Sequence, residues 1–392
     1  MIGQSYKWLE QEVDLVKEKG LYRQLRTISP SDSSNKANVD GVEYLMASSN
    51  NYLGLAADKR LVDAAITAMK KYGIGSTGSR LTTGNTNLHE KLEKRIADFK
   101  KDEAAIVFSS GYLANIGTVS SLAGKGDVIL SDQLNHASII DGCRLSQAKS
   151  MVYRHMDMKD LREKLIYSQH YKRKFIITDG VFSMDGDIAP LGEIKELAEK
   201  YGAYVIVDDA HSTGVLGKNG RGTADHLKVS VDVTVGTFSK SIGTQGGFVT
   251  GSRSLIDYLR NKARSFIFQT ALPPSTIAAT LKSIDIIESQ PELQMDLQQK
   301  VHLLRDELLG FGFDLRGRET PIFPIIIGET NKAMDFSKRL EKDRIFAPAI
   351  RPPSVPYGGS RIRMTIMATH TEQDIQQISK TFYKVGKELE VI

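Results

Sequence analysis

Two stretches of sequence, AYVIVDDAHSTG (203–214) and DVTVGTFSKSIG (232–243), decide the fold. Each begins with a short apolar run rich in β-branched residues, which is typical of a strand buried on both faces of a parallel sheet. Each run then passes into small and polar residues that form turns. Ligands of open α/β sheets bind beyond the carboxyl ends of the strands, so we expect Asp208 and Lys240 to lie near a binding site.

Further apolar runs of the same kind surround this pair. They are AAIVF (104–108), DVILSD (127–132), KFIITD (174–179) and GGFVTG (246–251). Apolar residues at helical spacing predict two helices before the first run, one through Leu61, Ala65 and Met69 and one through Leu88, Leu92, Ile96 and Phe99. This alternation predicts an α/β fold with a mainly parallel sheet covered by helices, in which the last pair of strands can be antiparallel.

Changes in composition and hydrophobic pattern along the chain predict three parts. Residues 1–45 hold an amphipathic helix, predicted over residues 4–19 and expected to pack on the main body or on a second subunit, and a polar, loop-like segment at 27–40. Residues 46–285 form the large domain. Residues 286–392 combine charged helical patterns with apolar runs and form a smaller α+β C-terminal domain.

Composition excludes several classes of protein. The 392 residues carry a formal net charge of +5 without a block of like charges, so nucleic-acid binding has little support. One cysteine, Cys143, leaves an intrachain disulfide impossible and fits a reducing cytoplasm. No apolar run approaches the roughly 18 residues of a membrane span, and the N-terminus shows no targeting segment. We expect a cytoplasmic protein.

Chemically useful residues follow several of the predicted strands. Gly111 opens a helix whose free N–H groups suit a phosphate, His136 is placed to stack on a flat ring, and Ser183 lies in a loop where it could donate to a cofactor oxygen. Each of these features, taken alone, also fits ordinary turn or surface chemistry.

Acids and a lysine complete the pattern. Asp208 can hold a heteroaromatic nitrogen protonated, and His211 can reach a neighbouring ring oxygen. Metal binding by Asp208, Asp209 and His211 is the competing interpretation, although no further cluster completes a shell. Lys240 can lose its proton by desolvation and act as nucleophile or base, unless it is a surface lysine. An acidic strand end and a later strand-end lysine together resemble the Schiff-base geometry of pyridoxal-phosphate (PLP) enzymes.

Ten motifs in order along the chain carry a family resemblance. They are SSNNYLGL (48–55), GIGSTGSRLTTGN (73–85), HEKLE (89–93), SSGYLAN (109–115), LNHASIIDG (134–142), TDGVFSMDGD (178–187), VDDAHSTGVLG (207–217), GRGT (220–223), GTFSKSIG (236–243) and RIRMTI (361–366). From about Arg23 to the C-terminus the chain resembles the α-oxoamine synthases, PLP-dependent transferases of fold type I.

The resemblance implies roles for individual residues. Lys240 would form the Schiff base with the cofactor, Asp208 would pair with the pyridine nitrogen, His211 would contact the phenolic oxygen and His136 would stack over the ring. The residues implied to hold the cofactor also include Gly111, Tyr112, Ser183, Thr237 and, across the interface of a homodimer, Thr270.

The resemblance also implies a substrate site. Arg363 would bind the carboxylate of the amino acid, Asn50 would line the site, and Arg23 and Ser354 would lie near the acyl substrate. Arg361 shares a strand face with Arg363, so the choice between them rests on the resemblance, and Arg361 can instead form a surface or structural ion pair.

Within the family, GSTGSRLTTGN (75–85) and AIRPPSVPYG (349–358) most resemble the branch that condenses L-alanine with pimeloyl-CoA or pimeloyl-acyl-carrier protein in biotin biosynthesis. The alternative within the family is the branch that joins glycine to acetyl-CoA. An aminotransferase would share the lysine and aspartate framework. A PLP-sensing regulator would need a DNA-binding module, for which the residues before SSNNYLGL are too few.

Overall fold

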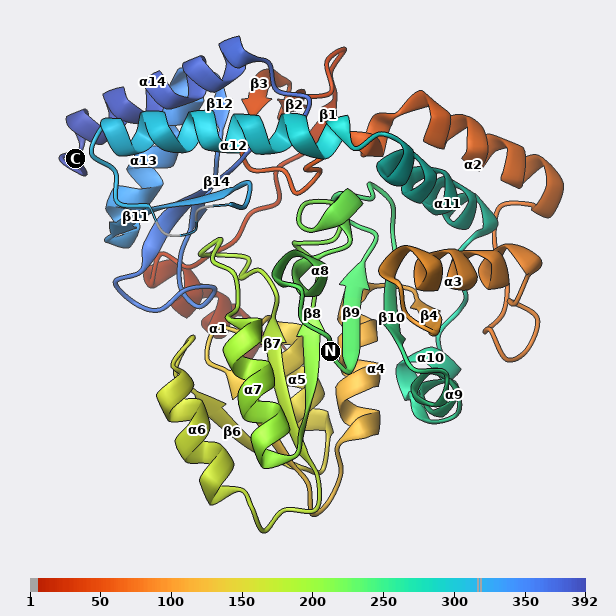
Figure 1. Ribbon diagram of the computed structural model, residues 1–392. Helices are drawn as coiled ribbons and strands as arrows, with labels where there is room; N and C mark the ends of the chain where they lie inside the picture. The colour runs from red at the N-terminus through yellow and green to blue at the C-terminus, as the bar shows by residue number, and fades with distance from the viewer. Residues whose placement is uncertain (1–5, 316, 318) are drawn as a thin grey trace.

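The computed structural model describes residues 6–315, 317 and 319–392, and a seven-stranded sheet forms its centre (Figure 1). The strands are β4 (Ala104–Phe108), β5 (Val128–Asp132), β6 (Lys149–Tyr153), β7 (Lys174–Asp179), β8 (Ala203–Asp208), β9 (Val233–Thr237) and β10 (Gly247–Gly251). Their order is β4-β10-β9-β8-β7-β5-β6. Strands β6, β5, β7, β8 and β9 are parallel, and β10 runs antiparallel to both β9 and β4. The predicted mainly parallel sheet and the antiparallel last pair are confirmed.

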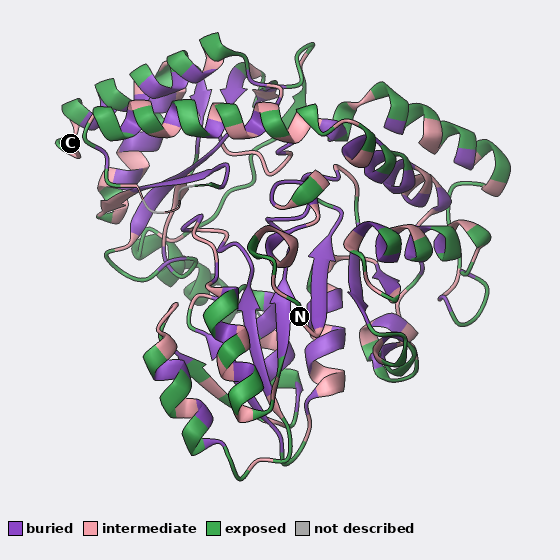
Figure 2. Ribbon diagram, in the orientation of Figure 1, coloured by how far each residue is buried: buried purple, intermediate pink, exposed green. Residues whose placement is uncertain are grey.

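Helices cover both faces of this sheet because its strands are apolar on both faces. In β8, Ile206 packs into one apolar cluster, and Val205 and Val207 pack into another on the opposite face. The α-helices between β3 (Val42–Met46) and α12 (Glu292–Gly310) are α2 (Lys59–Tyr72), α3 (Asn87–Lys100), α4 (Gly111–Leu122), α5 (Ala137–Leu145), α6 (Met158–Tyr167), α7 (Leu191–Tyr201), α8 (Thr223–Leu227), α9 (Arg253–Lys262), α10 (Arg264–Ile267) and α11 (Pro274–Ser289). Figure 2 shows the buried strands between helices with exposed outer faces.

The C-terminal part is α+β, as the sequence predicts. It contains α12 (Glu292–Gly310), β11 (Ile322–Gly328), α13 (Thr330–Lys342), β12 (Ile345–Phe346), β13 (Ala349–Ile350), β14 (Ser360–Thr365) and α14 (Glu372–Glu388). Strands β11, β14 and β13 form one antiparallel sheet. No helix in the described part of the chain is long and apolar enough to span a bilayer.

The segment at 27–40 is not the predicted loop. It contains β1 (Ile28–Pro30) and β2 (Lys36–Val39), which join β3 (Val42–Met46) in an antiparallel ribbon. Strand β12 extends this ribbon by pairing in parallel with β3, so distant parts of the chain complete the sheet. The sequence did not predict these strands because the segment is mostly polar, and in β2 only Ala37 and Val39 bury apolar side chains. The division into three domains stays a prediction.

The N-terminal helix is α1 (Lys7–Glu18), and positions 4 and 5 of its predicted range lie outside the described residues. None of residues 7–18 is buried, and Trp8, Leu9, Val13 and Val16 are exposed. The predicted packing of this helix on the main body is therefore wrong for the single chain. Packing on a second subunit stays a prediction.

A buried ion pair holds the segment 75–85 on helix α3. Arg80 donates to both carboxylate oxygens of Glu93, at 2.7 and 3.0 Å, and also to Asn85 Oδ1 at 2.7 Å. Glu93, on α3, accepts from the backbone N–H of Val107 at 3.0 Å. The Arg80 and Glu93 side chains are only 7% and 12% exposed, so neither charge has water as an alternative partner.

Substitution Glu93→Gln is therefore expected to lower the free energy of unfolding by about 3–5 kcal/mol, because it leaves the buried Arg80 guanidinium uncompensated. Urea unfolding followed by circular dichroism measures the change. Asp63→Asn is the control, because it removes the exposed pair with Lys59 and should cost less than about 1 kcal/mol. Equal effects of the two substitutions would contradict the importance of the buried pair.

Candidate active site

A cavity of about 260 Å³ lies where the carboxyl ends of β7, β8 and β9 meet the start of α4. Its lining residues are Ser110, Gly111, Tyr112, Asn115, His136, Ser138, Asp179, Ser183, Asp208, Ala210, His211, Thr237, Ser239 and Lys240. The structure thus brings together eight of the residues that the sequence singled out, from five separate segments of the chain.

Asp208 is the buried acid of this cavity. Its carboxylate accepts a hydrogen bond from Asn115 Nδ2 at 2.6 Å and one from the backbone N–H of Ala210 at 2.9 Å. Asp179 is the register partner of Asp208 on β7, and burial followed by the charge of Asp208 raises the pKa of Asp179 well above its usual range. Burial and the neighbouring acid therefore favour the neutral, protonated form of Asp179.

Asp209 has a different, structural role. Its carboxylate accepts from Lys100 Nζ at 2.9 Å and from Ser212 Oγ at 2.5 Å, and it is fully buried. Since Asp209 faces Lys100 rather than the cavity, Asp208 and Asp209 do not act as a pair. Among the described residues no cluster of three or more His, Cys, Asp or Glu side chains is arranged to hold a metal ion.

Lys240 follows β9 and reaches into the same cavity. Burial lowers the pKa of its amine from the ordinary 10.5, the charges of Asp208 and Asp179 oppose this shift, and the guanidinium of Arg363 adds to it. A lysine with a lowered pKa holds more of the neutral amine that attacks a carbonyl carbon.

The two arginines of β14 have separate partners. Arg363 donates to the carbonyl of Ser183, to Asn50 Oδ1 at 3.0 Å and to the hydroxyl of Tyr52 at 3.2 Å. Arg361 instead forms a buried ion pair with Asp185 at 2.7 Å and also donates to the carbonyl of Met184 at 3.1 Å. Arg361 is therefore the structural ion pair that the sequence left open.

Tyr52 connects Arg363 to His211. Its hydroxyl lies 2.7 Å from His211 Nδ1 as well as 3.2 Å from Arg363 Nη2, and its ring is fully buried. Burial lowers the pKa of His211 below its usual range, and the nearby cations Lys240 and Arg363 lower it further. The imidazole is therefore neutral at physiological pH.

Another part of the cavity wall is built from small residues and hydroxyls. Ser110 caps α4 by accepting from the N–H of Leu113 at 3.1 Å. A Cβ at Gly111 would lie 3.0 Å from the Cβ of Thr237, so a side chain there would crowd the wall. Thr237 Oγ1 lies 2.8 Å from Ser239 Oγ. Helix N–H groups and hydroxyls together suit a phosphate.

His136 and Tyr112 form the exposed wall. Their ring centroids are 6.4 Å apart in an edge-to-face arrangement, and Tyr112 donates to Asp141. The backbone N–H of His136 donates to Asp179 at 2.9 Å, which fixes the start of α5 beside the buried acids. His136 thus lines the cavity from the start of α5.

Five predicted residues do not line this cavity in the single chain. Two of them, Asn50 and Arg363, are hydrogen-bonded to each other at 3.0 Å. Thr270 is exposed and bridges to Ser79, and Arg23 and Ser354 are also exposed. Arg351 donates to the carbonyls of Gly20 and Tyr22, the latter at 2.7 Å, and so brings the segment of Arg23 beside that of Ser354.

Sequence reasoning missed several residues that build the site, among them Tyr52, Asn115 and Asp179. Tyr52 and Asn115 stand inside motifs quoted for the resemblance, and Asp179 ends an apolar run as Asp208 does. Asp179 could have been found by that parallel with Asp208. Tyr52 contacts His211 and Asn115 contacts Asp208, and both contacts join segments far apart in the sequence, so residue spacing gives no sign of them.

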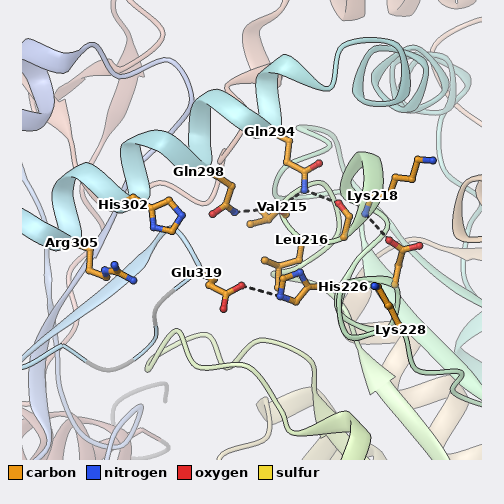
Figure 3. Close-up of a pocket in the computed structure, with 12 residues that line it drawn as sticks. Val215, Leu216, Lys218, His226, Lys228, Gln294, Gln298, His302, Arg305 and Glu319 are labelled. Atoms are coloured by element: carbon orange, nitrogen blue, oxygen red, sulfur yellow. Dashed lines mark hydrogen bonds and ion pairs between the residues drawn. The ribbon is translucent and has the colours of Figure 1, made fainter.

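A second, larger cavity of about 770 Å³ lies between the segment after β8 and helix α12 (Figure 3). Here His226 Nε2 lies 3.0 Å from a carboxylate oxygen of Glu319, and Gln294 donates to the carbonyls of Val215 and Gly217, each at 2.8 Å. The described residues that line it include no predicted site residue, so the smaller cavity is the candidate active site.

Both a protein-family model and individual known proteins match this chain. A family model for aminotransferases of class I and II matches residues 43–382. 8-Amino-7-oxononanoate synthase 2 of Bacillus subtilis (strain 168) is 53% identical over 385 residues, which cover 98% of this chain and 99% of the relative. 8-Amino-7-oxononanoate synthase of Lysinibacillus sphaericus is 54% identical over 383 residues, covering 97% and 98%.

Solved structures of known enzymes also share the fold of this chain. Serine palmitoyltransferase of Sphingomonas wittichii superposes with a TM-score of 0.93 at 32% identity over 100% of both chains. 8-Amino-7-oxononanoate synthase of Francisella tularensis superposes with a TM-score of 0.78 at 32% identity over 89% of this chain and 99% of the other. Fold and site thus define a PLP-dependent enzyme of the class I and II aminotransferase fold. Within that class the chain belongs to the α-oxoamine synthase family, as its motifs predict.

In the cofactor-free protein we expect Lys240 to be acetylated half-maximally below pH 10.5, because its pKa is lowered by burial. Brief treatment with acetic anhydride across a pH series, followed by peptide mass spectrometry, measures this midpoint. Arg363→Gln should raise the midpoint because it removes a neighbouring cation. Labelling of the exposed Lys125 in the same digests controls for reagent loss. A Lys240 midpoint at or above pH 10.5 would contradict the electrostatics described here.

Proposed function

We propose that this chain is an 8-amino-7-oxononanoate synthase. It would condense L-alanine with pimeloyl-CoA or pimeloyl-acyl-carrier protein and release 8-amino-7-oxononanoate, CO2 and the free thiol, a step of biotin biosynthesis. The observation that carries the proposal is full-length similarity, at 47–55% identity, to relatives of that name from several organisms. The family member that joins glycine to acetyl-CoA is the alternative.

The residues of the cavity fit pyridoxal phosphate. The chain offers an amine at Lys240, a buried carboxylate at Asp208, a neutral imidazole at His211, and N–H groups and hydroxyls near Gly111 and Thr237. Asn115 Oδ1, also in the cavity wall, is buried and has no hydrogen-bond partner among the described residues, which leaves an acceptor for a bound group. PLP, when bound, supplies an electron sink for negative charge at the α-carbon of an amino acid.

Lys240 and Asp208 divide the acid–base work. Asp208 would keep a proton on the heteroaromatic nitrogen, since its carboxylate is fixed in the cavity by hydrogen bonds from Asn115 and from the N–H of Ala210. Lys240 would take the α-proton of alanine at Nζ and return a proton after CO2 is lost, a role that its lowered pKa favours because more of the amine is then neutral. His211 would hold the phenolic oxygen, and His136 would cover the ring.

Arg363 would bind the carboxylate of alanine. Its guanidinium is already oriented by Ser183, Asn50 and Tyr52, so little freedom is lost when a bidentate pair forms. The orientation would direct the Cα–H bond toward Lys240. Arg361, paired with Asp185, has no charge to spare for the substrate.

The acyl substrate and the assembly complete the proposal. Arg23 and Ser354, on the two segments that Arg351 joins, would contact the acyl thioester. The enzyme would act as a homodimer in the cytoplasm, with Thr270 reaching the phosphate in the site of the partner subunit. The exposure of Thr270 and of the apolar residues of α1 supports a subunit contact at these surfaces.

A product assay tests the function. Purified protein with PLP receives L-alanine and pimeloyl-CoA in one tube, and glycine and acetyl-CoA in another. We expect 8-amino-7-oxononanoate and free thiol in the first tube only, and loss of at least about a thousandfold in rate for Lys240→Ala, which lacks the base.

Product in the glycine tube would mean that the substrates are glycine and acetyl-CoA, and the class of reaction would be unchanged. Full activity of Lys240→Ala would remove the role of this lysine. Conversion of the cofactor to its pyridoxamine form with alanine alone, without any need for a thioester, would indicate an aminotransferase instead.

The two arginines are expected to respond differently to substitution. Arg363→Gln should raise the KM for alanine by about a hundredfold, because it removes the bidentate charge pair with the carboxylate. Arg361→Gln should mainly lower thermal stability, because it leaves Asp185 buried and unpaired. Steady-state kinetics and thermal melting of both variants make the comparison, and a larger effect of Arg361→Gln on the KM would reverse the assignment.

A further inference from the structure

His155 lies between two carboxylates just beyond the active-site cavity. Its Nδ1 is 2.9 Å from Asp132 Oδ1, and its Nε2 is 3.0 Å from Asp187 Oδ2. The imidazole packs edge-on against Phe182, with ring centroids 4.4 Å apart, and its side chain is 19% exposed. Both ring nitrogens are therefore occupied by acids that come from different segments.

Asp132 belongs to the turn that presents His136. It ends β5, and its carboxylate also accepts from the backbone N–H groups of Leu134 at 2.9 Å and Met156 at 3.0 Å. The turn closes with the N–H of Asn135 on the carbonyl of Asp132, directly before His136. A contact that fixes the position of Asp132 therefore also fixes His136, the residue proposed to cover the cofactor.

Asp187 belongs to the loop that presents Ser183. The N–H of Phe182 donates to the carbonyl of Asp187 at 3.0 Å, and the N–H of Gly186 donates to the carbonyl of Phe182 at 2.8 Å, so residues 182–187 form one closed loop. The carbonyl of Ser183 accepts from Arg363. The position of this loop thus sets both a cavity wall and the orientation of the carboxylate-binding arginine.

The charge of the imidazole matters for both contacts. Only the protonated ring can donate to two carboxylates at once, because a neutral ring has a single N–H. The two acids raise the pKa of His155 to about 9 against the effect of burial. The neighbouring charged or titratable groups are Tyr153, whose hydroxyl is buried, and Arg154, which pairs with Asp157 at 2.8 Å.

We propose that His155, as an imidazolium, is a positioning residue that ties the turn of His136 to the loop of Ser183 and thereby sets two walls of the cofactor cavity. The inference rests on the proposed roles of His136 and Ser183. It assigns a positioning function to a residue that touches neither cofactor nor substrate. Asp132 and Asp187 share this function as the two hydrogen-bond partners of His155.

His155→Gln tests this inference. We expect about tenfold to a hundredfold weaker PLP binding by the cofactor-free protein, from the loss of two charge-assisted hydrogen bonds. Amide hydrogen exchange, measured on the same cofactor-free protein, should accelerate in residues 132–138 and 182–188 and stay unchanged in α14. His170→Gln is the matched control, because His170 is exposed and lies against Tyr167 and Tyr171.

The pH dependence separates positioning from bulk stability. The folded-state pKa is raised above the ordinary 6.5, so the stabilisation is complete below about pH 6.5 and is lost as the pH rises through about 9. Exchange protection of the two segments in the wild type should fall across that window. His155→Gln should show no such transition.

Two results would overturn the proposal: unchanged PLP affinity with unchanged exchange in the two segments, or faster exchange spread evenly over the chain. If His155→Gln does not fold, Asp187→Asn serves instead, because it keeps the contact with Asp132. Its expected result is weaker PLP binding and faster exchange at 182–188 alone. These readouts need no acyl thioester, so a failed product assay would refute the proposed reaction and leave this inference standing.

Discussion

The arrangement of the site depends on one constraint, which is that a carboxylate is buried at the end of β8 beside a second acid on β7. Asp208 and Asp179 are register partners, so both cannot stay charged without donors. The donors come from α4 through Asn115 and from α5 through the N–H of His136. The start of each of these helices is therefore drawn to the same sheet edge, and the cavity is the space that remains between them.

A second set of buried charges joins the C-terminal sheet to this edge. Arg361 and Arg363 project from β14 to the loop at 183–187, one onto Asp185 and one onto the carbonyl of Ser183. Since Arg363 also contacts Tyr52, the segment before α2 is included in the same network. The orientation of the Arg363 guanidinium is thus set by two distant parts of the chain, the loop at 183–187 and the segment 50–52.

Most strands of the seven-stranded sheet could be predicted because burial on both faces demands continuous apolar runs, as in β8. The same rule explains two failures. Strand β6 (KSMVY) lies at the edge of the sheet and is largely exposed, so its composition is mixed. The ribbon of β1 and β2 is polar because it covers little of the core. In both places, tertiary position rather than local preference selected the strand.

The sequence by itself determined which chemistry the chain can carry: an acid, a lysine and small residues directly after apolar strands, in an order that identifies the family. Turn chemistry and strand burial are local properties, so they can be read from neighbouring residues. Only the tertiary structure decided which side chains share a partner. Asp209 turns to Lys100, Arg361 to Asp185, and Tyr52 links Arg363 to His211, because contacts between distant segments depend on packing that residue spacing does not record.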